Sequence, residues 1–299
     1  MPLTCSPRSP LAASPFRWQW GSLGLSILVA IAPVRPVEAL QVTVTPTNPK
    51  LGDTLRVTVQ YDDPTRTATP QITVGKQTYP TFATGSNQFR ALVPTTPLDK
   101  PGKLTLTVAG EGEIANIAVG LGTRKFPTQS IWLSGSGSEG TDHEFDRVDA
   151  FKQLVTPEKL WSGKFLRPNR GPVTTVYGVR RYYNGKFAQD YYHRGIDYAG
   201  ASGSPVVAPA AGRVALVGRV AQGFKLHGNT IGLDHGQGIT TIYLHLRQIN
   251  VQEGDVVKPG QVIGSVGSTG ASTGPHLHWG LYVHGLSVDP IPWLTRGFD

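Results

Sequence analysis

The sequence predicts an all-β chain with a small N-terminal β-sandwich, a connector that contains one short helix, and a C-terminal domain built from strands. Three observations support this prediction. The 36 glycines and 24 prolines among 299 residues indicate many turns. Short runs rich in Val and Thr alternate apolar with polar residues, as half-buried strands do. Turn-forming stretches such as NPKLGD and DKPG separate these runs.

Residues 1–39 have the pattern of an export signal. Arg8 and Arg17 precede the apolar run GSLGLSILVAIA, and the small residues of VEA suit cleavage after Ala39. A retained membrane anchor is the alternative, but the run is shorter than the about 20 apolar residues that a spanning helix needs. We therefore expect an exported chain that begins at Leu40 and has no stable membrane insertion after signal removal.

Charge and cysteine content limit the possible partners. The formal net charge of +8 suits binding to acidic polymers of the cell envelope, although a basic protein without such a partner has the same charge. No cluster of Lys and Arg with interleaved aromatic residues indicates nucleic-acid binding. The single cysteine, Cys5, lies in the expected signal, upstream of its apolar run. The mature chain is therefore expected to contain no disulfide and no lipid-attachment cysteine.

Residues 40–122 are expected to form the β-sandwich. Leu55, Val57 and Val59 alternate with polar neighbours, and turn formers separate several runs of this kind. Short strands at such spacing are typical of a sandwich. The region has no cluster of chemically reactive side chains, so we interpret it as a positioning module.

Residues 123–164 are expected to be a connector. A Ser/Gly-rich tract, SGSGSEG, comes first and predicts a flexible segment. Thr141 and Glu144 then have the spacing of a capping box. Apolar residues follow at intervals of three, which predicts one short helix: Phe145, Val148 and Phe151.

Residues 165–299 contain seven of the eight histidines. In the run GITTIYLHL, strand alternation places His245 with Thr241 and Tyr243, opposite three apolar residues. These apolar residues are Ile242, Leu244 and Leu246. A single histidine in a strand is more often structural than catalytic, so this strand alone predicts no site.

A second predicted strand begins in the stretch GPHLHW. His276 and His278 are two residues apart, so an extended backbone places both on one face, opposite Leu277 and Trp279. We expect the histidines of both strands to lie on the face away from the core. Three such histidines favour a metal or acid–base site over a structural role.

The stretch HRGIDYAG adds His193 and Asp197, four residues apart. A straight strand separates such residues by roughly 13 Å, too far for one metal ion. Gly195 and Gly200 disfavour a helix, and we expect Gly195 to permit a sharp bend instead. Taken alone, the pattern is weak evidence for a metal site.

Together and in this order, HRGIDYAG, YLHL and GSTGASTGPHLHWGL resemble the lysostaphin-type zinc peptidoglycan endopeptidases. The resemblance covers about the C-terminal half and implies that residues 165–299 form an antiparallel β-sheet metallopeptidase domain. It implies that one Zn²⁺ is bound by His193, Asp197 and His278. His245 and His276 correspond to the family's histidines that act on the water and the transition state, and none of the five residues is replaced.

The resemblance implies an exported zinc metalloendopeptidase that hydrolyses stem or cross-link peptides of peptidoglycan. Three protein ligands with one open position are typical of catalytic zinc. The alternative is a non-catalytic cell-wall-binding regulator that activates other hydrolases, but relatives of that kind have lost zinc ligands. The run VQEGDVVKPGQVIGSVG also resembles a biotinyl or lipoyl hairpin. Such a carrier needs a lysine at the tip of the hairpin, and STGAST, which follows the run, has none. The sequence assigns neither the scissile bond nor an oligomeric state.

Overall fold

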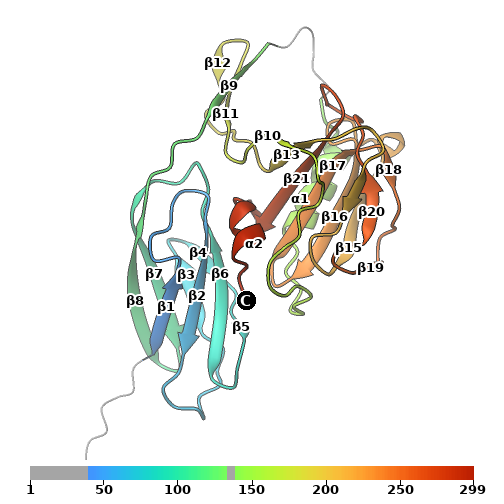
Figure 1. The fold of residues 1–299 in the computed structure, drawn as a ribbon. Helices are drawn as coiled ribbons and strands as arrows, with labels where there is room; N and C mark the ends of the chain where they lie inside the picture. The colour runs from blue at the N-terminus through green and yellow to red at the C-terminus, as the bar shows by residue number, and fades with distance from the viewer. Residues whose placement is uncertain (1–39, 133–138) are drawn as a thin grey trace, which may run out of the picture. The chain divides into compact units, whose positions relative to one another are not determined.

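The computed structural model describes residues 40–132 and 139–299. The expected export signal, its cleavage after Ala39 and most of the Ser/Gly tract lie outside the described residues. The described residues belong to one compact unit. The predicted all-β class is confirmed, because the regular structure of the described residues is almost entirely strand, arranged in sheets that are mainly antiparallel (Figure 1). Among the described helices, no helix has both the length and the apolar character that a membrane crossing needs.

The N-terminal part is a sandwich of two four-stranded antiparallel sheets, with orders β1-β2-β6-β5 and β4-β3-β7-β8. The strands are β1 (Gln41–Thr45), β2 (Thr54–Gln60), β3 (Gln71–Val74), β4 (Gln77–Tyr79), β5 (Phe82–Ala83), β6 (Gln88–Pro94), β7 (Gly102–Gly110) and β8 (Glu113–Leu121). The alternation predicted for β2 is confirmed, because Leu55, Val57 and Val59 are fully buried. They form one core with Ile72 and Leu106 of the other sheet.

The connector contains one strand that the sequence did not predict and one helix that it did. Strand β9 (Thr128–Ile131) pairs in parallel with β11 (Arg180–Tyr183). Helix α1 (Asp142–Lys152) begins with the predicted capping box, in which the Thr141 hydroxyl accepts a hydrogen bond from the Glu144 amide and the Glu144 carboxylate accepts one from the Thr141 amide. Val148 and Phe151 are buried, and Phe145 is exposed.

The C-terminal part is centred on an eight-stranded sheet with the order β10-β13-β21-β17-β16-β15-β19, and β22 pairs with β21. These strands are β10 (Val173–Thr175), β13 (Ile196–Ala199), β15 (Gly212–Gly218), β16 (Asn229–Gly236), β17 (Ile239–Leu246), β19 (Val256–Val257), β21 (His276–Val283) and β22 (Leu286–Ser287). Two three-stranded sheets, β12-β11-β9 and β14-β20-β18, complete this part. Their other strands are β12 (Lys186–Phe187), β14 (Pro205–Val207), β18 (Gln248–Ile249) and β20 (Val262–Ser265), and the short helices are η1 (Val220–Gln222) and α2 (Ile291–Thr295).

The expectation for β17 is wrong in one respect. The face of Thr241 and Tyr243, expected to lie away from the core, is the core face, and both residues are fully buried. The opposite face, with Ile242 and Leu244, packs on Phe151 of α1. Both faces of β17 are therefore covered, and alternation alone does not say which face carries the larger core.

His245 departs from this alternation through a β-bulge. The register between β16 and β17 shifts opposite Asn229 and Ile231, and the φ angle of His245 is 63°. Leu246 consequently joins the same core as Tyr243, although an unbroken strand would place these two residues on opposite faces. A bulge re-aims the side chains of its strand. It is this bulge, and not the strand period, that determines where the imidazole of His245 points.

Candidate active site

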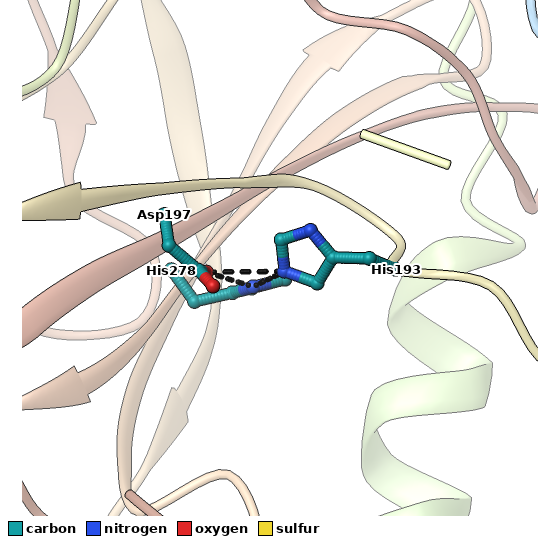
Figure 2. Close-up of side chains that lie close together, drawn as sticks. All are labelled: His193, Asp197 and His278. Carbon is teal, nitrogen blue, oxygen red and sulfur yellow. Dashed lines mark hydrogen bonds and ion pairs between the residues drawn. The ribbon is translucent and has the colours of Figure 1, made fainter. Parts of the chain in front are cut away.

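Three side chains converge on one point of the C-terminal part. His193 lies just before β13, Asp197 lies in β13, and His278 lies in β21 (Figure 2). Nε2 of His193 is 3.1 Å from Oδ1 of Asp197 and 3.1 Å from Nδ1 of His278. The third side of the triangle, from Asp197 Oδ1 to His278 Nδ1, measures 2.9 Å. These are the three side chains expected to bind a metal, and all are buried or half-buried.

Strand pairing places two of these residues. Asp197 is directly opposite His278 in the antiparallel β13–β21 pair, so their side chains share a face. The amide of His193 donates a hydrogen bond to the carbonyl of Val179 at 2.9 Å, which fixes the chain before it enters β13. Gly195 does not adopt a positive φ. The chain nevertheless bends at Gly195, as expected. A Cβ there would lie 2.4 Å from the carbonyl oxygen of Trp279 and 2.8 Å from Nε2 of His278, so the position also has no room for a side chain.

The distances within this triangle suit a tetrahedral metal ion. Bonds of about 2.0–2.1 Å from Zn²⁺ to N and O ligands place neighbouring donors of a tetrahedron about 3.3 Å apart. The observed separations of 2.9–3.1 Å are close to that value. Two imidazoles and one carboxylate also form a donor set that zinc accepts.

The hydrogen bond on the other ring nitrogen sets the tautomer of His193. Its Nδ1 lies 2.9 Å from the carbonyl oxygen of Val176, which can only accept a hydrogen bond. Neutral His193 therefore carries its proton on Nδ1 and directs the lone pair of Nε2 toward Asp197 and His278. Lone pairs at this separation repel one another unless a proton or a metal ion lies between them. A histidine that binds a metal through one ring nitrogen while the other donates to a carbonyl is a common arrangement of metal sites.

Charge states in the triangle favour metal binding. Burial acts to raise the pKa of Asp197, but the adjacent imidazoles of His193 and His278 outweigh it and hold the pKa well below its usual range. Burial lowers the pKa of His278 to about 4. At neutral pH the carboxylate is ionised and His278 is neutral, and these are the protonation states that metal ligands require.

Two further histidines form a pair beside the triangle. The rings of His245 and His276 have centroids 4.9 Å apart and are inclined at 49°. His276 is the first residue of β21, two positions from His278 and on the same face, as predicted from the extended backbone. His245 reaches His276 from the bulge in β17.

Backbone carbonyls orient both rings of this pair. Nδ1 of His245 donates to the carbonyl of Thr269, and Nδ1 of His276 donates to the carbonyl of Gly274, each at 2.9 Å. The neutral rings are thereby left with a lone pair on Nε2. Burial, together with the imidazoles of His278 and His276, lowers the pKa of His245 to about 3. His245 is therefore neutral at pH 7.

The other histidines of this part make structural contacts. His235 is fully buried, its Nδ1 donates to the carbonyl of Ala211, and its Nε2 accepts from the hydroxyl of Thr241 at 2.8 Å. His284 is half-buried, and among the described residues its two buried ring nitrogens have no hydrogen-bond partner. His227 contacts Glu144, with 2.6 Å between its Nδ1 and the carboxylate.

Arg181, Tyr191 and Tyr192 lie shortly before His193 in the sequence. Arg181 donates a hydrogen bond to the hydroxyl of Tyr191 at 2.7 Å, and this pair lies on the chain that leads to His193. The hydroxyl of Tyr192 donates to the carbonyl of Ser287 at 3.1 Å, within the core. Tyr192 is thus a packing residue.

Sequence reasoning missed the carbonyls of Val176, Thr269 and Gly274, which determine the tautomers of three histidines. Every residue has a backbone carbonyl, so no residue type marks these positions. Their importance comes entirely from the fold, which brings them to the imidazoles.

Three side chains that could hold a metal ion, on an antiparallel β-sheet, are the features to compare with known proteins. Residues 191–290 match the family model described as Peptidase family M23. The C-terminal half therefore contains a domain of this family.

Particular relatives agree with this assignment. The DD-carboxypeptidase/endopeptidase Mpg of Neisseria meningitidis is 44% identical over 99 residues, which is 33% of this chain and 22% of that relative. Lysostaphin of Staphylococcus staphylolyticus is 42% identical over 107 residues, 34% of this chain and 22% of that protein. The chain thus matches about a fifth of the length of each of these curated relatives.

A solved structure extends the similarity beyond the matched domain. A Pseudomonas aeruginosa protein assigned to peptidase M23 superposes with a TM-score of 0.63 at 25% sequence identity. The superposition covers 84% of this chain and 96% of the other. The β-sandwich and the C-terminal part are therefore an arrangement of elements that another protein shares.

Proposed function

We propose that this protein is an exported zinc metalloendopeptidase that hydrolyses peptide bonds in the stem or cross-link peptides of bacterial peptidoglycan. One observation carries the proposal: the triangle of His193, Asp197 and His278 lies beside two imidazoles whose Nε2 atoms are free to accept a proton. His193, Asp197 and His278 are the metal ligands, and His245 and His276 are the catalytic residues.

The ligand set leaves room for chemistry. Zinc held there by His193, Asp197 and His278 would supply a Lewis acid for water and for the scissile carbonyl. Three protein ligands would leave a position for water, which a fourth histidine ligand would take. His276 shares a face with His278 but does not belong to the triangle of donor atoms, which suits a role in proton transfer rather than metal binding.

The two histidines match the proton movements of peptide hydrolysis. Attack of water on the carbonyl releases one proton and creates an oxyanion, and departure of the amine consumes one proton. A neutral imidazole can accept the first proton, donate a hydrogen bond to the oxyanion, and return the proton to the amine. His245 is neutral at pH 7 because of its lowered pKa, and the Thr269 carbonyl keeps its Nε2 unprotonated.

The relatives support the proposed substrate class. The printed name of the meningococcal relative describes a DD-carboxypeptidase and endopeptidase, and lysostaphin is a second relative over the same part of the chain. The basic character of the chain suits an anionic wall polymer. Export would bring the enzyme to that polymer.

Digestion of purified peptidoglycans, with products identified by mass spectrometry, tests the proposal. We expect new amino and carboxyl termini within stem or cross-link peptides, loss of activity with a chelator, and recovery with Zn²⁺. Absence of cleavage by zinc-loaded protein on peptidoglycans of several cross-link types would contradict it. If that inactive protein increased cleavage by another wall hydrolase, the regulator alternative would replace the enzyme.

A further inference from the structure

Glu144 has more hydrogen-bond partners than a helix cap requires. Its side chain is fully buried. The capping box accounts for only one contact to the carboxylate, from the amide of Thr141 at 3.4 Å. The remaining donors belong to a loop about 80 residues later in the chain: the amides of Lys225, Leu226 and His227 at 3.0, 3.1 and 2.6 Å, and Nδ1 of His227 at 2.6 Å.

These contacts make the carboxylate an anchor for that loop. Three successive amides that converge on one anion form a nest, which holds the backbone in a fixed conformation. A buried carboxylate is costly without such partners. Burial acts to raise the pKa of Glu144, but the amides and His227 outweigh it and lower the pKa, so the side chain stays ionised at neutral pH.

The anchored loop directly supports His245. The carbonyl of His227 accepts the backbone N–H of His245 at 3.0 Å. The carbonyl of Leu226 accepts the amide of Ala271 at 2.9 Å, which ties the loop to the segment that contains Thr269. The carbonyl of Thr269 in turn accepts Nδ1 of His245 at 2.9 Å. Both the backbone and the ring of His245 therefore depend on this loop.

We propose that Glu144 is a positioning residue for His245. It holds residues 225–227 so that the bulge at His245, with its left-handed backbone, keeps the imidazole oriented toward His276. This proposal rests on the proposed function, and it assigns to α1, which lies outside residues 191–290, a part in the active site.

The first test separates positioning from folding by kinetics on the full chain. Glu144→Gln keeps the side-chain length but replaces one acceptor oxygen with an amide group that cannot accept from the loop. With a soluble cross-link peptide as substrate, we expect kcat to fall roughly 10- to 100-fold, with KM and zinc content unchanged. Asp146→Asn removes an exposed carboxylate from the same helix and should leave kcat unchanged.

A double-mutant cycle shows whether the effect acts through His245. In a His245→Ala background, Glu144→Gln should cause little further loss of kcat, because the group that it positions is absent. Full multiplication of the two losses would overturn the proposal. If Glu144→Gln does not fold, Glu144→Asp takes its place in the same double-mutant cycle. It keeps the charge, but its side chain is too short to reach all the loop amides.

A spectroscopic measurement does not depend on activity. ¹⁵N NMR of the imidazoles, with the His245 signal assigned by its loss in His245→Ala, should show one Nδ1–H tautomer in the wild type and in Asp146→Asn. In Glu144→Gln we expect a mixture of tautomers or a broadened signal. An unchanged His245 signal in Glu144→Gln would overturn the positioning role, whereas a wild type without peptidase activity but with the expected signals would contradict only the proposed function.

Discussion

The β-sandwich of β1–β8 and the eight-stranded sheet of the C-terminal part are both antiparallel, yet they bury different kinds of side chain. The sandwich core is apolar, and the polar residues buried in that part are Thr54, Thr81, Arg90, Thr95 and Thr96. The C-terminal part buries His193, Asp197, His235 and His245 as well as its apolar core. All eight histidines follow the sandwich in the sequence.

The buried residues of the sandwich contribute to stability, whereas those of the C-terminal part include groups that can take part in chemistry. Burying apolar side chains stabilises both parts, so strand alternation predicts strands in either one. Burying titratable groups costs free energy unless they are hydrogen-bonded or bind an ion. A buried cluster of such groups is therefore the stronger indication of function.

The largest effect should follow from loss of a metal ligand. His278→Ala and Asp197→Ala should lose zinc affinity and, for that reason, nearly all activity. Metal content and turnover must be measured on the same folded preparations, with the exposed His143→Ala as the control. Zinc retained by His278→Ala but lost by His276→Ala would show that the two roles are reversed.

A smaller but still severe effect is expected at the second pair. His245→Ala and His276→Ala should bind one zinc per chain and lose about 10²- to 10⁴-fold in kcat, the range for a lost acid–base group. The measurement is kcat on a soluble peptide with zinc content determined in parallel. Full activity in both variants would remove the catalytic assignment.

A moderate effect concerns acid stability. Burial lowers the pKa of His235, His278 and His284 to about 4, and that of His245 to about 3. Unfolded histidine has a pKa of about 6.5, so the unfolded chain binds more protons below that pH. The melting temperature of metal-free protein should therefore fall as the pH drops from about 6.5 to about 4.

Two variants test whether the buried histidines cause this pH dependence of the melting temperature. His284→Asn removes one of the four histidines, suits the positive φ of 48° at that position, and should flatten the pH dependence. His143→Ala should leave it unchanged, because His143 is exposed. An equally steep dependence in His284→Asn would argue against burial of His284 in its neutral form.

The smallest effect on activity is expected in the sandwich. Leu106 is fully buried there, so Leu106→Ala should lower the free energy of unfolding by about 2–5 kcal/mol. Zinc content and kcat should match the wild type at temperatures below the unfolding transition. A changed kcat in this variant would mean that the two regions do not divide the work as proposed.

The sequence predicts the β class, the strands of the sandwich and the capping box of α1 because each depends on local periodicity or spacing. The face shared by His276 and His278 follows from the same rule. His245 does not, because its orientation depends on a bulge opposite β16 and on the covering of β17 by α1. The bend at Gly195 was predicted from the sequence, but the close approach of His278, 83 residues away in the chain, was not.

The left-handed backbone of His245 has a consequence for protein engineering. A residue other than glycine in this conformation costs about 1–2 kcal/mol, which the surrounding hydrogen bonds must offset. Glycine at position 245 would relieve that strain while removing the imidazole. A selection that rewarded only resistance to heat would therefore accept His245→Gly, and a selection for wall cleavage would reject it, so stability and activity are opposed at this single position.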